Sequence, residues 1–164
     1  MSHHTNEDKL GDCKLLAFDF DGVFTDNKVY INEKGEEMIR CDRSDTFGLK
    51  ELVATDVAVI ILSTEVNDVV LHRAKKLGIP VTNNIPDKGK ALKDEIKKRG
   101  LTATEVVYVG NDVNDLPAFK VAGFSIAVAD AHPSVQSQVD YTTKAAGGDG
   151  AVREVIELIL SAKQ

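Results

Sequence analysis

The chain has 164 residues, of which 43% are hydrophobic and 28% charged, a composition typical of one soluble globular domain and unlike that of a disordered chain. Its formal net charge of −6 disfavours non-specific nucleic-acid binding, which needs a basic surface. The longest apolar stretch, at residues 57–62, is far shorter than the ~20 residues that span a bilayer. The first residues do not pair basic side chains with an apolar run, so we expect no secretory signal. We expect a cytoplasmic protein with neither a nucleic-acid nor a membrane partner, in which Cys13 and Cys41 stay reduced.

The N-terminal part of the chain changes character after residue 12. Residues 1–12 are polar and lack periodicity, so we expect a flexible tail before a single domain at residues 13–164. An apolar run within residues 14–20 is typical of a strand buried on both faces. Two β-like segments around a turn then predict a β-hairpin at residues 29–41.

Helical stripes and short apolar runs alternate from residue 47 onward. Apolar residues spaced by about 3.6 predict the helices, and Gly78 and Gly100 mark two of their ends. The expected strands cover residues 57–62, 79–82, 106–109 and 125–128, and the expected helices cover 47–53, 66–77, 87–99, 116–122, 135–139 and 151–160. This alternation predicts an α/β fold with a Rossmann-like, doubly wound parallel sheet.

Polar side chains gather where the expected strands end and where one helix begins. In chain order they are Asp19 and Asp21, Ser63 and Thr64, Lys88, and Asn111, Asp112 and Asp115. Ligands of open α/β sheets bind outside the carboxyl ends of the strands, so these groups are expected to share one site. Either acidic cluster alone could equally be a pair of turns, because Asp, Asn and Gly are common there. Their joint placement favours a site.

The residue types at these positions suit phosphoryl transfer. Oxygen ligands without a Cys or His partner favour a hard cation, and Mg²⁺ suits a few carboxylates together with phosphate and water. A metal, a lysine and a hydroxyl around one carboxylate can offset the charge of a transferring phosphoryl group. Asp19 is then a candidate nucleophile that forms an aspartyl-phosphate, and Asp21 a candidate general acid and base.

These motifs resemble those of the haloacid dehalogenase (HAD) superfamily of phosphatases, over nearly the whole chain. The resemblance is carried by DFDGVFTD at residues 19–26, DRSDTFG at 42–48, GNDVND at 110–115, ADAHP at 129–133 and GGDGAVRE at 147–154. The chain looks most similar to the branch that lacks a large cap domain. That branch includes 3-deoxy-D-manno-octulosonate 8-phosphate phosphatases and the phosphatase-like domains of acylneuraminate cytidylyltransferases.

The resemblance implies a role for each site residue. Asp19 would be nucleophile and Mg²⁺ ligand, Asp21 acid/base and backbone-carbonyl ligand, and Ser63 and Lys88 would bind the phosphoryl group. A third metal ligand would come from Asn111, with Asp112 and Asp115 close by. Substrate-binding positions are implied at Asp42, Ser44, Asp45, Thr46, Lys50, Thr64, Glu65 and Arg73. The hairpin would assemble a homotetramer in which a neighbour covers the active site in place of a cap.

Two positions depart from the family pattern. Glu65 stands where octulosonate phosphatases usually carry an arginine that can pair with a carboxylate or phosphate, so a nonulosonate 9-phosphate or another sugar phosphate is an alternative substrate. Asn111 stands where most family members have an aspartate, and its neutral amide supplies one negative charge fewer to Mg²⁺.

Three functions remain open from the sequence. The first is a Mg²⁺-dependent phosphatase of a sugar-acid phosphate. The second, motivated by Asn111, is a non-catalytic or weakly active HAD-fold module for oligomerisation or regulation in sialic-acid-type nucleotide-sugar synthesis. A phosphorylation-dependent receiver domain ranks last, because Asn83 and Asn84 follow the third strand, where a receiver bears its phospho-accepting aspartate.

Overall fold

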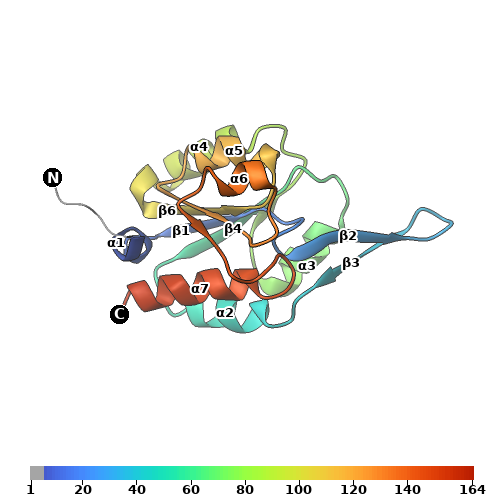
Figure 1. Cartoon of the computed structure of the whole chain (residues 1–164), viewed down its shortest axis with the longest axis horizontal. Coiled ribbons are helices and arrows are strands. Elements are labelled where there is room, and N and C mark those ends of the chain that lie inside the picture. The colour runs from blue at the N-terminus through green and yellow to red at the C-terminus, as the bar shows by residue number, and fades with distance from the viewer. Residues whose placement is uncertain (1–5) are drawn as a thin grey trace.

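The computed structural model describes residues 6–164 and contains a six-stranded parallel sheet flanked by helices (Figure 1). In spatial order the strands are β5 (Val81–Thr82), β4 (Ala58–Leu62), β1 (Leu15–Phe18), β6 (Val106–Gly110), β7 (Phe124–Ala127) and β8 (Tyr141–Thr142). The chain starts in the middle, winds outward to β5, and returns to wind outward on the other side. This order confirms the predicted doubly wound fold.

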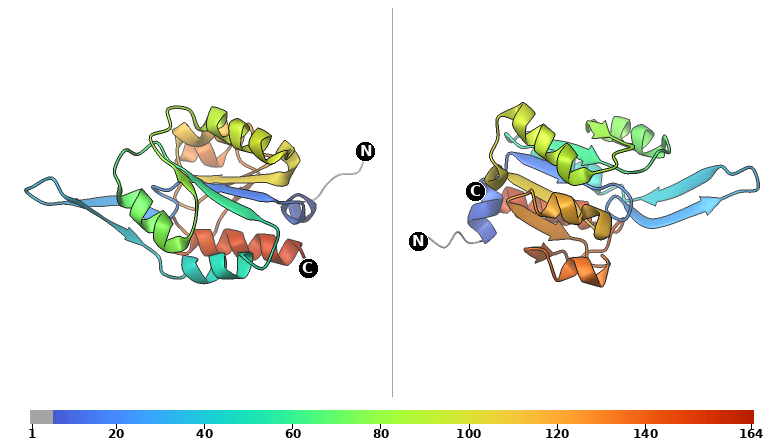
Figure 2. Two further views of the ribbon diagram at one scale, coloured as in Figure 1. Left: turned by 180° about the vertical axis from the view of Figure 1, so that it is seen from behind. Right: turned by 90° about the horizontal axis from the view of Figure 1, so that it is seen from above.

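Helices cover both faces of the sheet. They are α1 (Asn6–Gly11), α2 (Asp45–Leu52), α3 (Val69–Leu77), α4 (Lys88–Arg99), α5 (Leu116–Phe119), α6 (Pro133–Gln136) and α7 (Ala151–Ala162), with 3-10 turns at Ala103–Glu105 and Val113–Asp115. Figures 1 and 2 show α4 and α5 on one face, and α2 and α7 on the other. Gly78 and Gly100 end α3 and α4 with φ of 72° and 66°, as the sequence predicts.

The apolar runs of the sequence form the core because central strands are covered on both faces. Every residue of β1 and β6 is buried. Phe18, Phe20 and Phe24 continue the core beyond the end of β1, with ring centroids 5.2 Å and 5.7 Å from that of Phe24. The carboxyl end of β1, where the first acidic motif begins, is therefore anchored by packed phenylalanine rings.

A β-hairpin of β2 (Thr25–Ile31) and β3 (Glu37–Cys41) projects from the end of the molecule opposite α1 and the C-terminus (Figures 1 and 2). The chain between β1 and α2 forms this hairpin and no further domain, in agreement with the expected cap-less architecture. Tyr30 and Met38 face each other across the two strands and are 63% and 67% exposed.

The structure differs from the sequence prediction at residues 6–12. The expected flexible tail is wrong here, because α1 forms and packs against α7. Leu10 is buried beneath it, and Lys163 Nζ donates to the Gly11 carbonyl at 3.1 Å. A single buried leucine was too weak a pattern to predict this helix. Residues 1–5 of the expected tail lie outside the described residues.

The short edge elements are also displaced from their predicted bounds. The sequence did not predict β8, whose two residues give no alternating pattern, and α6 begins at Pro133 instead of residue 135. Across residues 6–164, no helix combines the length and the apolar character needed to cross a bilayer.

Candidate active site

The first acidic motif begins one residue after β1. The Asp19 N–H donates to the Val109 carbonyl at 2.8 Å, which extends the pairing of β1 with β6. The Asp19 side chain is 5% exposed, and its Oδ1 accepts a 2.7 Å hydrogen bond from the Phe20 N–H. The carboxylate is therefore held at the carboxyl edge of the sheet, as the sequence predicts.

Asn111 meets this carboxylate from the neighbouring strand. The end of its amide that faces the motif lies 3.0 Å from Asp19 Oδ2 and 3.0 Å from the Asp21 carbonyl oxygen. With its nitrogen turned toward them, the amide donates to both atoms. With its oxygen turned toward them, three oxygens converge on one point, which only a cation stabilises.

This donor set fits a hard divalent ion. Within residues 6–164 no three His, Cys, Asp or Glu side chains form a metal-binding group. The candidate centre instead combines one carboxylate, one backbone carbonyl and one amide, all oxygen ligands of the kind that Mg²⁺ accepts while keeping several waters. Asp19, Asp21 and Asn111 are thus brought together as the sequence predicts.

Gly22 allows the two motifs to approach. Its φ is +82°, a conformation that side chains disfavour, and a Cβ at this position would clash with the Asn111 side-chain amide. The Gly22 N–H donates to Thr25 Oγ1 at 3.0 Å, which fixes the turn before the hairpin. The Asp-Gly step of the motif is therefore required by close packing as well as by turn geometry.

Lys88 lies beneath Asp19. Asp87 caps α4 by accepting from the Lys90 N–H at 3.0 Å, so Lys88 opens the helix and points into the sheet edge. Its Nζ lies 2.7 Å from Asp19 Oδ1 and 2.7 Å from Asp115 Oδ1, and it is 1% exposed. Burial alone lowers the pKa of Lys88, but the charges of Asp19 and Asp115 outweigh it and raise the pKa.

The buried charges do not cancel. One ammonium faces two carboxylates, and burial, with Asp115 second, raises the pKa of Asp19. A divalent cation next to Asp19 Oδ2 would offset the excess negative charge. This imbalance is a second observation that fits a metal at the oxygen triad.

Asp115, predicted to lie close to the metal, contacts Lys88 from behind and does not face the oxygen triad. Its side chain is fully buried, and both of its oxygens are occupied. Oδ1 contacts Lys88 and accepts from the Tyr108 hydroxyl at 2.7 Å, while Oδ2 accepts from the backbone N–H groups of Asn111 and Asp112 at 2.8 Å and 3.2 Å. No lone pair faces the pocket, so Asp115 organises the loop and the lysine.

A pocket of about 310 Å³ opens above the oxygen triad. Its lining residues are Asp19, Asp21, Asn27, Thr64, Asn111, Asp112, Val113 and Asn114. Asp112 is at its edge, where Oδ1 accepts from the Val113 N–H at 2.7 Å. Ser63 is buried just before Thr64, and its hydroxyl accepts from the Glu65 N–H at 3.1 Å. Asp19, Asp21, Asn111 and Asp112 therefore line one pocket, and Lys88 contacts Asp19 from below it.

Asp21 extends toward the hairpin. Burial, followed by the charge of Glu65, raises the pKa of its carboxyl, which favours a protonated side chain. Asp21, Glu37 and Glu65 line a second, much smaller pocket of about 30 Å³, and Asn67 Nδ2 donates to Glu37 at 2.8 Å. Glu65 is thus placed near the site, as predicted, and makes its surroundings acidic.

Six of the predicted substrate positions, on the loop before α2, in α2 and in α3, are not brought to the pocket that Asp19 lines. Asp42, Ser44, Asp45, Thr46, Lys50 and Arg73 are all absent from its walls. Arg73 Nη2 donates to the Asp42 carbonyl at 2.8 Å, so this pair closes the loop. Asp45 is 1% exposed, and neither of its oxygens has a hydrogen-bond partner among residues 6–164. Asp42 and Arg73 thus contact each other and Asp45 is buried within the subunit, and contact of all six positions with a substrate stays a prediction.

Two residues of the site escaped the sequence reasoning. Tyr108 reads as one more apolar residue of a buried strand, although its hydroxyl reaches Asp115. Asn27 lines the pocket and has a φ of +61°, but a single Asn at the start of a hairpin resembles any turn residue. A phenol in an otherwise Val-Val-Val-Gly strand was the one signal available for Tyr108.

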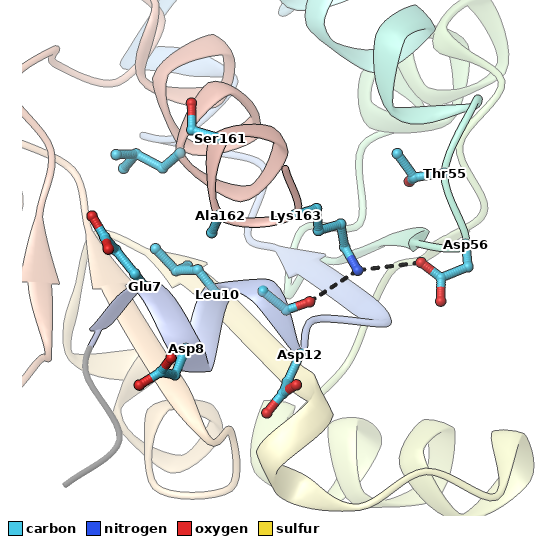
Figure 3. Close-up of a pocket in the computed structure, with 11 residues that line it drawn as sticks. Glu7, Asp8, Leu10, Asp12, Thr55, Asp56, Ser161, Ala162 and Lys163 are labelled. Carbon is cyan, nitrogen blue, oxygen red and sulfur yellow. Dashed lines mark hydrogen bonds and ion pairs between the residues drawn. The ribbon is translucent and has the colours of Figure 1, made fainter.

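A larger pocket of about 1040 Å³ lies at the other end of the molecule, between α1 and the end of α7 (Figure 3). It is lined by carboxylates of α1 and by Lys163, whose Nζ is held by the Gly11 carbonyl and by Asp56 Oδ1 at 3.2 Å. Figure 3 shows the labelled carboxylates of Asp8 and Asp12 pointing away from Lys163. This pocket lies away from the carboxyl ends of the strands, so the triad remains the candidate active site.

The chain is similar to known proteins over most of its length. It is 36% identical to 3-deoxy-D-manno-octulosonate 8-phosphate phosphatase KdsC of Escherichia coli (strain K12) over 156 residues, which cover 94% of this chain and 83% of that protein. A structure of this phosphatase from Moraxella catarrhalis with magnesium, phosphate and KDO superposes with a TM-score of 0.91 at 36% identity, covering 96% of this chain and 91% of that one. The cobalt-bound phosphatase from Haemophilus influenzae gives 0.89 at 36% identity, covering 94% and 91%.

The family match agrees with the geometry. Residues 49–156 match the family described as haloacid dehalogenase-like hydrolase. This segment contains Lys88, Asn111 and Asp115, whereas Asp19, the carboxylate that they surround, follows β1 in the part of the chain before the matched segment. The chain therefore belongs to the haloacid dehalogenase-like hydrolases.

Proposed function

We propose that this hydrolase is a Mg²⁺-dependent phosphatase that cleaves the phosphate monoester of a sugar acid through an aspartyl-phosphate on Asp19. The observation that carries the proposal is the convergence of Asp19, the Asp21 carbonyl and Asn111 at 3.0 Å, with Lys88 2.7 Å from the same carboxylate. The groups come from the ends of β1 and β6 and from the start of α4, and together they match the needs of phosphoryl transfer.

The reaction divides between the two aspartates. The Asp19 carboxylate attacks phosphorus, and the bond from phosphorus to the sugar oxygen breaks. Asp21, whose raised pKa favours the protonated form, gives its proton to the leaving alkoxide. It then takes a proton from the water that attacks the aspartyl-phosphate, and phosphate leaves.

Lys88 and Ser63 hold the transferring group. The Lys88 ammonium offsets charge on phosphoryl oxygens beside Asp19. The Ser63 hydroxyl accepts from Glu65, so its own proton remains available for a phosphoryl oxygen. Mg²⁺, held by Asp19, the Asp21 carbonyl and Asn111, would supply Lewis-acid charge neutralisation.

The substrate class is taken from the relatives. The proteins from Escherichia coli and Moraxella catarrhalis are named for 3-deoxy-D-manno-octulosonate 8-phosphate. We extend this to a sugar-acid phosphate of octulosonate 8-phosphate or nonulosonate 9-phosphate type. The second type is included because Glu65 stands where octulosonate phosphatases usually carry an arginine. We place the reaction in the cytoplasm.

Phosphate release tests the proposal. The purified chain is incubated with 3-deoxy-D-manno-octulosonate 8-phosphate and with a nonulosonate 9-phosphate, each with Mg²⁺ and with EDTA. We expect Mg²⁺-dependent release from at least one of them, and loss of this release in Asp19→Asn. Equal background rates for the wild type and the variant would show that the proposal is wrong.

Asn111 favours one alternative function. Because it removes a formal charge from the metal centre, the domain could serve as a non-catalytic or weakly active module in sialic-acid-type nucleotide-sugar synthesis. A stable oligomer without Mg²⁺ binding would support that alternative, and robust turnover would exclude it.

We also propose a homotetramer assembled through the hairpin. Val29, Tyr30, Ile31 and Met38 are between 50% and 67% exposed, and large apolar side chains gathered on one hairpin indicate a surface that another subunit covers. Sedimentation equilibrium is expected to give a tetramer for the wild type and smaller species for Tyr30→Glu. A monomeric wild type would contradict this assembly.

A further inference from the structure

We infer that Tyr108 is a positioning residue for phosphoryl transfer: its phenol, acting through Asp115, holds the Lys88 ammonium against Asp19. The inference rests on the proposed function and adds a residue that touches neither the pocket nor the oxygen triad. It follows from one atom, Asp115 Oδ1, which lies 2.7 Å from the Tyr108 hydroxyl oxygen and 2.7 Å from Lys88 Nζ.

Tyr108 is fixed in place by the core. It lies in the middle of β6, opposite Ala17 of β1, and is completely buried. Its ring meets the Phe119 ring edge-on, with centroids 5.4 Å apart and planes at 78°. The hydroxyl is the single polar group of this side chain, and it points at the carboxylate below the active site.

Asp115 is held at both oxygens by two donors each. Oδ2 accepts from two backbone N–H groups, which set the position of the loop after β6. Oδ1 is shared between the phenol and the ammonium, so the phenol decides how strongly this oxygen attracts Lys88. Lys88 in turn is shared equally between Asp19 and Asp115, with 2.7 Å to each.

Removal of the phenol would disturb this balance. Asp115 Oδ1 would keep the ammonium as its one side-chain donor in a fully buried site, and its attraction for Lys88 would increase. The ammonium would then move toward Asp115 and away from Asp19 and the phosphoryl group. A buried tyrosine that merely satisfies its own hydroxyl would affect stability and leave turnover alone.

The test compares three variants. Tyr108→Phe removes the hydroxyl and keeps the ring. Tyr141→Phe makes the same change where the hydroxyl donates to Glu154 at 3.0 Å, outside the site. Phe119→Leu disturbs the ring contact and keeps the phenol, so it separates a loss of stability from a loss of positioning. Steady-state kinetics, thermal unfolding and the ¹⁵N-edited NMR signal of the Lys88 ammonium in metal-free protein are measured for each.

We expect kcat of Tyr108→Phe to fall about tenfold with KM changed by less than about twofold, since a bond that aligns a charged group is lost while substrate contacts remain. In Tyr108→Phe the NMR signal of the Lys88 ammonium should change its chemical shift and broaden. Tyr141→Phe and Phe119→Leu should keep the wild-type kcat and ammonium signal, even where Phe119→Leu lowers the unfolding temperature.

A Tyr108→Phe variant with wild-type kcat and an unchanged ammonium signal would overturn the inference. A wild type without phosphatase activity would contradict the proposed function instead. In that case the ammonium signal, which needs neither metal nor substrate, still decides whether Tyr108 positions Lys88.

Discussion

The side-chain amide of Asn111 lies 3.0 Å from Asp19 Oδ2, although the two residues come from different strands and different motifs. Two adjacent parallel strands, β1 and β6, end at the same level and bring these side chains together. The site can bind a metal when the Asn111 amide oxygen faces Asp19 and the Asp21 carbonyl, and cannot when the amide nitrogen faces them and donates hydrogen bonds.

Asn111→Asp is expected to strengthen Mg²⁺ binding about tenfold, because it adds a full negative charge next to the ion. In EDTA the same variant should be less stable than the wild type, since two carboxylates then face each other without a cation. Isothermal titration with Mg²⁺ and urea unfolding measure the two effects.

Asn114→Asp is the matched control for this change. It adds the same charge to the same pocket at an exposed position away from the oxygen triad. If both variants bind Mg²⁺ equally well, Asn111 is not a ligand and the assigned metal centre is wrong.

Lys88→Met is expected to abolish phosphatase activity and to lower the free energy of unfolding in EDTA by about 3–5 kcal/mol, because it leaves Asp19 and Asp115 buried without their countercharge. Lys90→Met is the control, because Lys90 lies two residues further along α4 and 77% of its side chain is exposed. It should change neither activity nor stability appreciably. Urea unfolding and phosphate release check both. Wild-type stability in Lys88→Met would mean that the buried ion pairs do not form.

Asp45 should give the protein a pH-dependent stability. Burial, followed by the charge of Asp42, raises the pKa of Asp45 to about 7 from an ordinary value of 3.8. As the pH rises from about 4 to about 7, the unfolded chain loses this proton first, so the native state loses up to about 4 kcal/mol relative to its stability below pH 4.

Asp45→Asn is expected to remove this dependence and to stabilise the protein at pH 8. Denaturant unfolding between pH 4.5 and 8 measures it, with the exposed Asp12→Asn as control. Parallel stability curves for the wild type and Asp45→Asn would contradict the burial of an unpaired carboxyl at this position.

Gly22→Ala is expected to impair both stability and the metal site. Its methyl group would meet the Asn111 amide, and its φ of +82° costs about 1 kcal/mol for a residue with a side chain. Gly35→Ala is the control, because its φ of +77° gives a similar backbone cost while no atom lies within 4 Å of the added Cβ. Mg²⁺ titration should therefore show weaker binding in Gly22→Ala and wild-type binding in Gly35→Ala.

Equal Mg²⁺ affinities of the two glycine variants would mean that Asn111 does not depend on its contact with Gly22. Their unfolding midpoints, measured in EDTA, show whether the added clash lowers stability beyond the shared backbone cost.

The sequence by itself determined the fold and most of the centre. Continuous apolar runs such as Leu15–Phe18 are typical of strands buried on both faces, and alternation of strands with helices indicates a parallel sheet. Parallel strands place every residue that follows a strand at one edge, which is why Asp19, Asn111 and the Ser63 hydroxyl could be assigned to one site before any contact was known.

Only the tertiary structure decided what each carboxylate does. Asp115 and Asp112 are three residues apart in one motif, yet one is sealed below the sheet edge by four donors and the other lines the pocket. Asp45 is likewise buried by tertiary packing, because it lies at the start of α2 on the side that faces the interior. The sequence shows which carboxylates are present. Their burial and the hydrogen-bond donors that distant segments supply determine whether each one is protonated and which way it points. Both factors exist only in the folded chain.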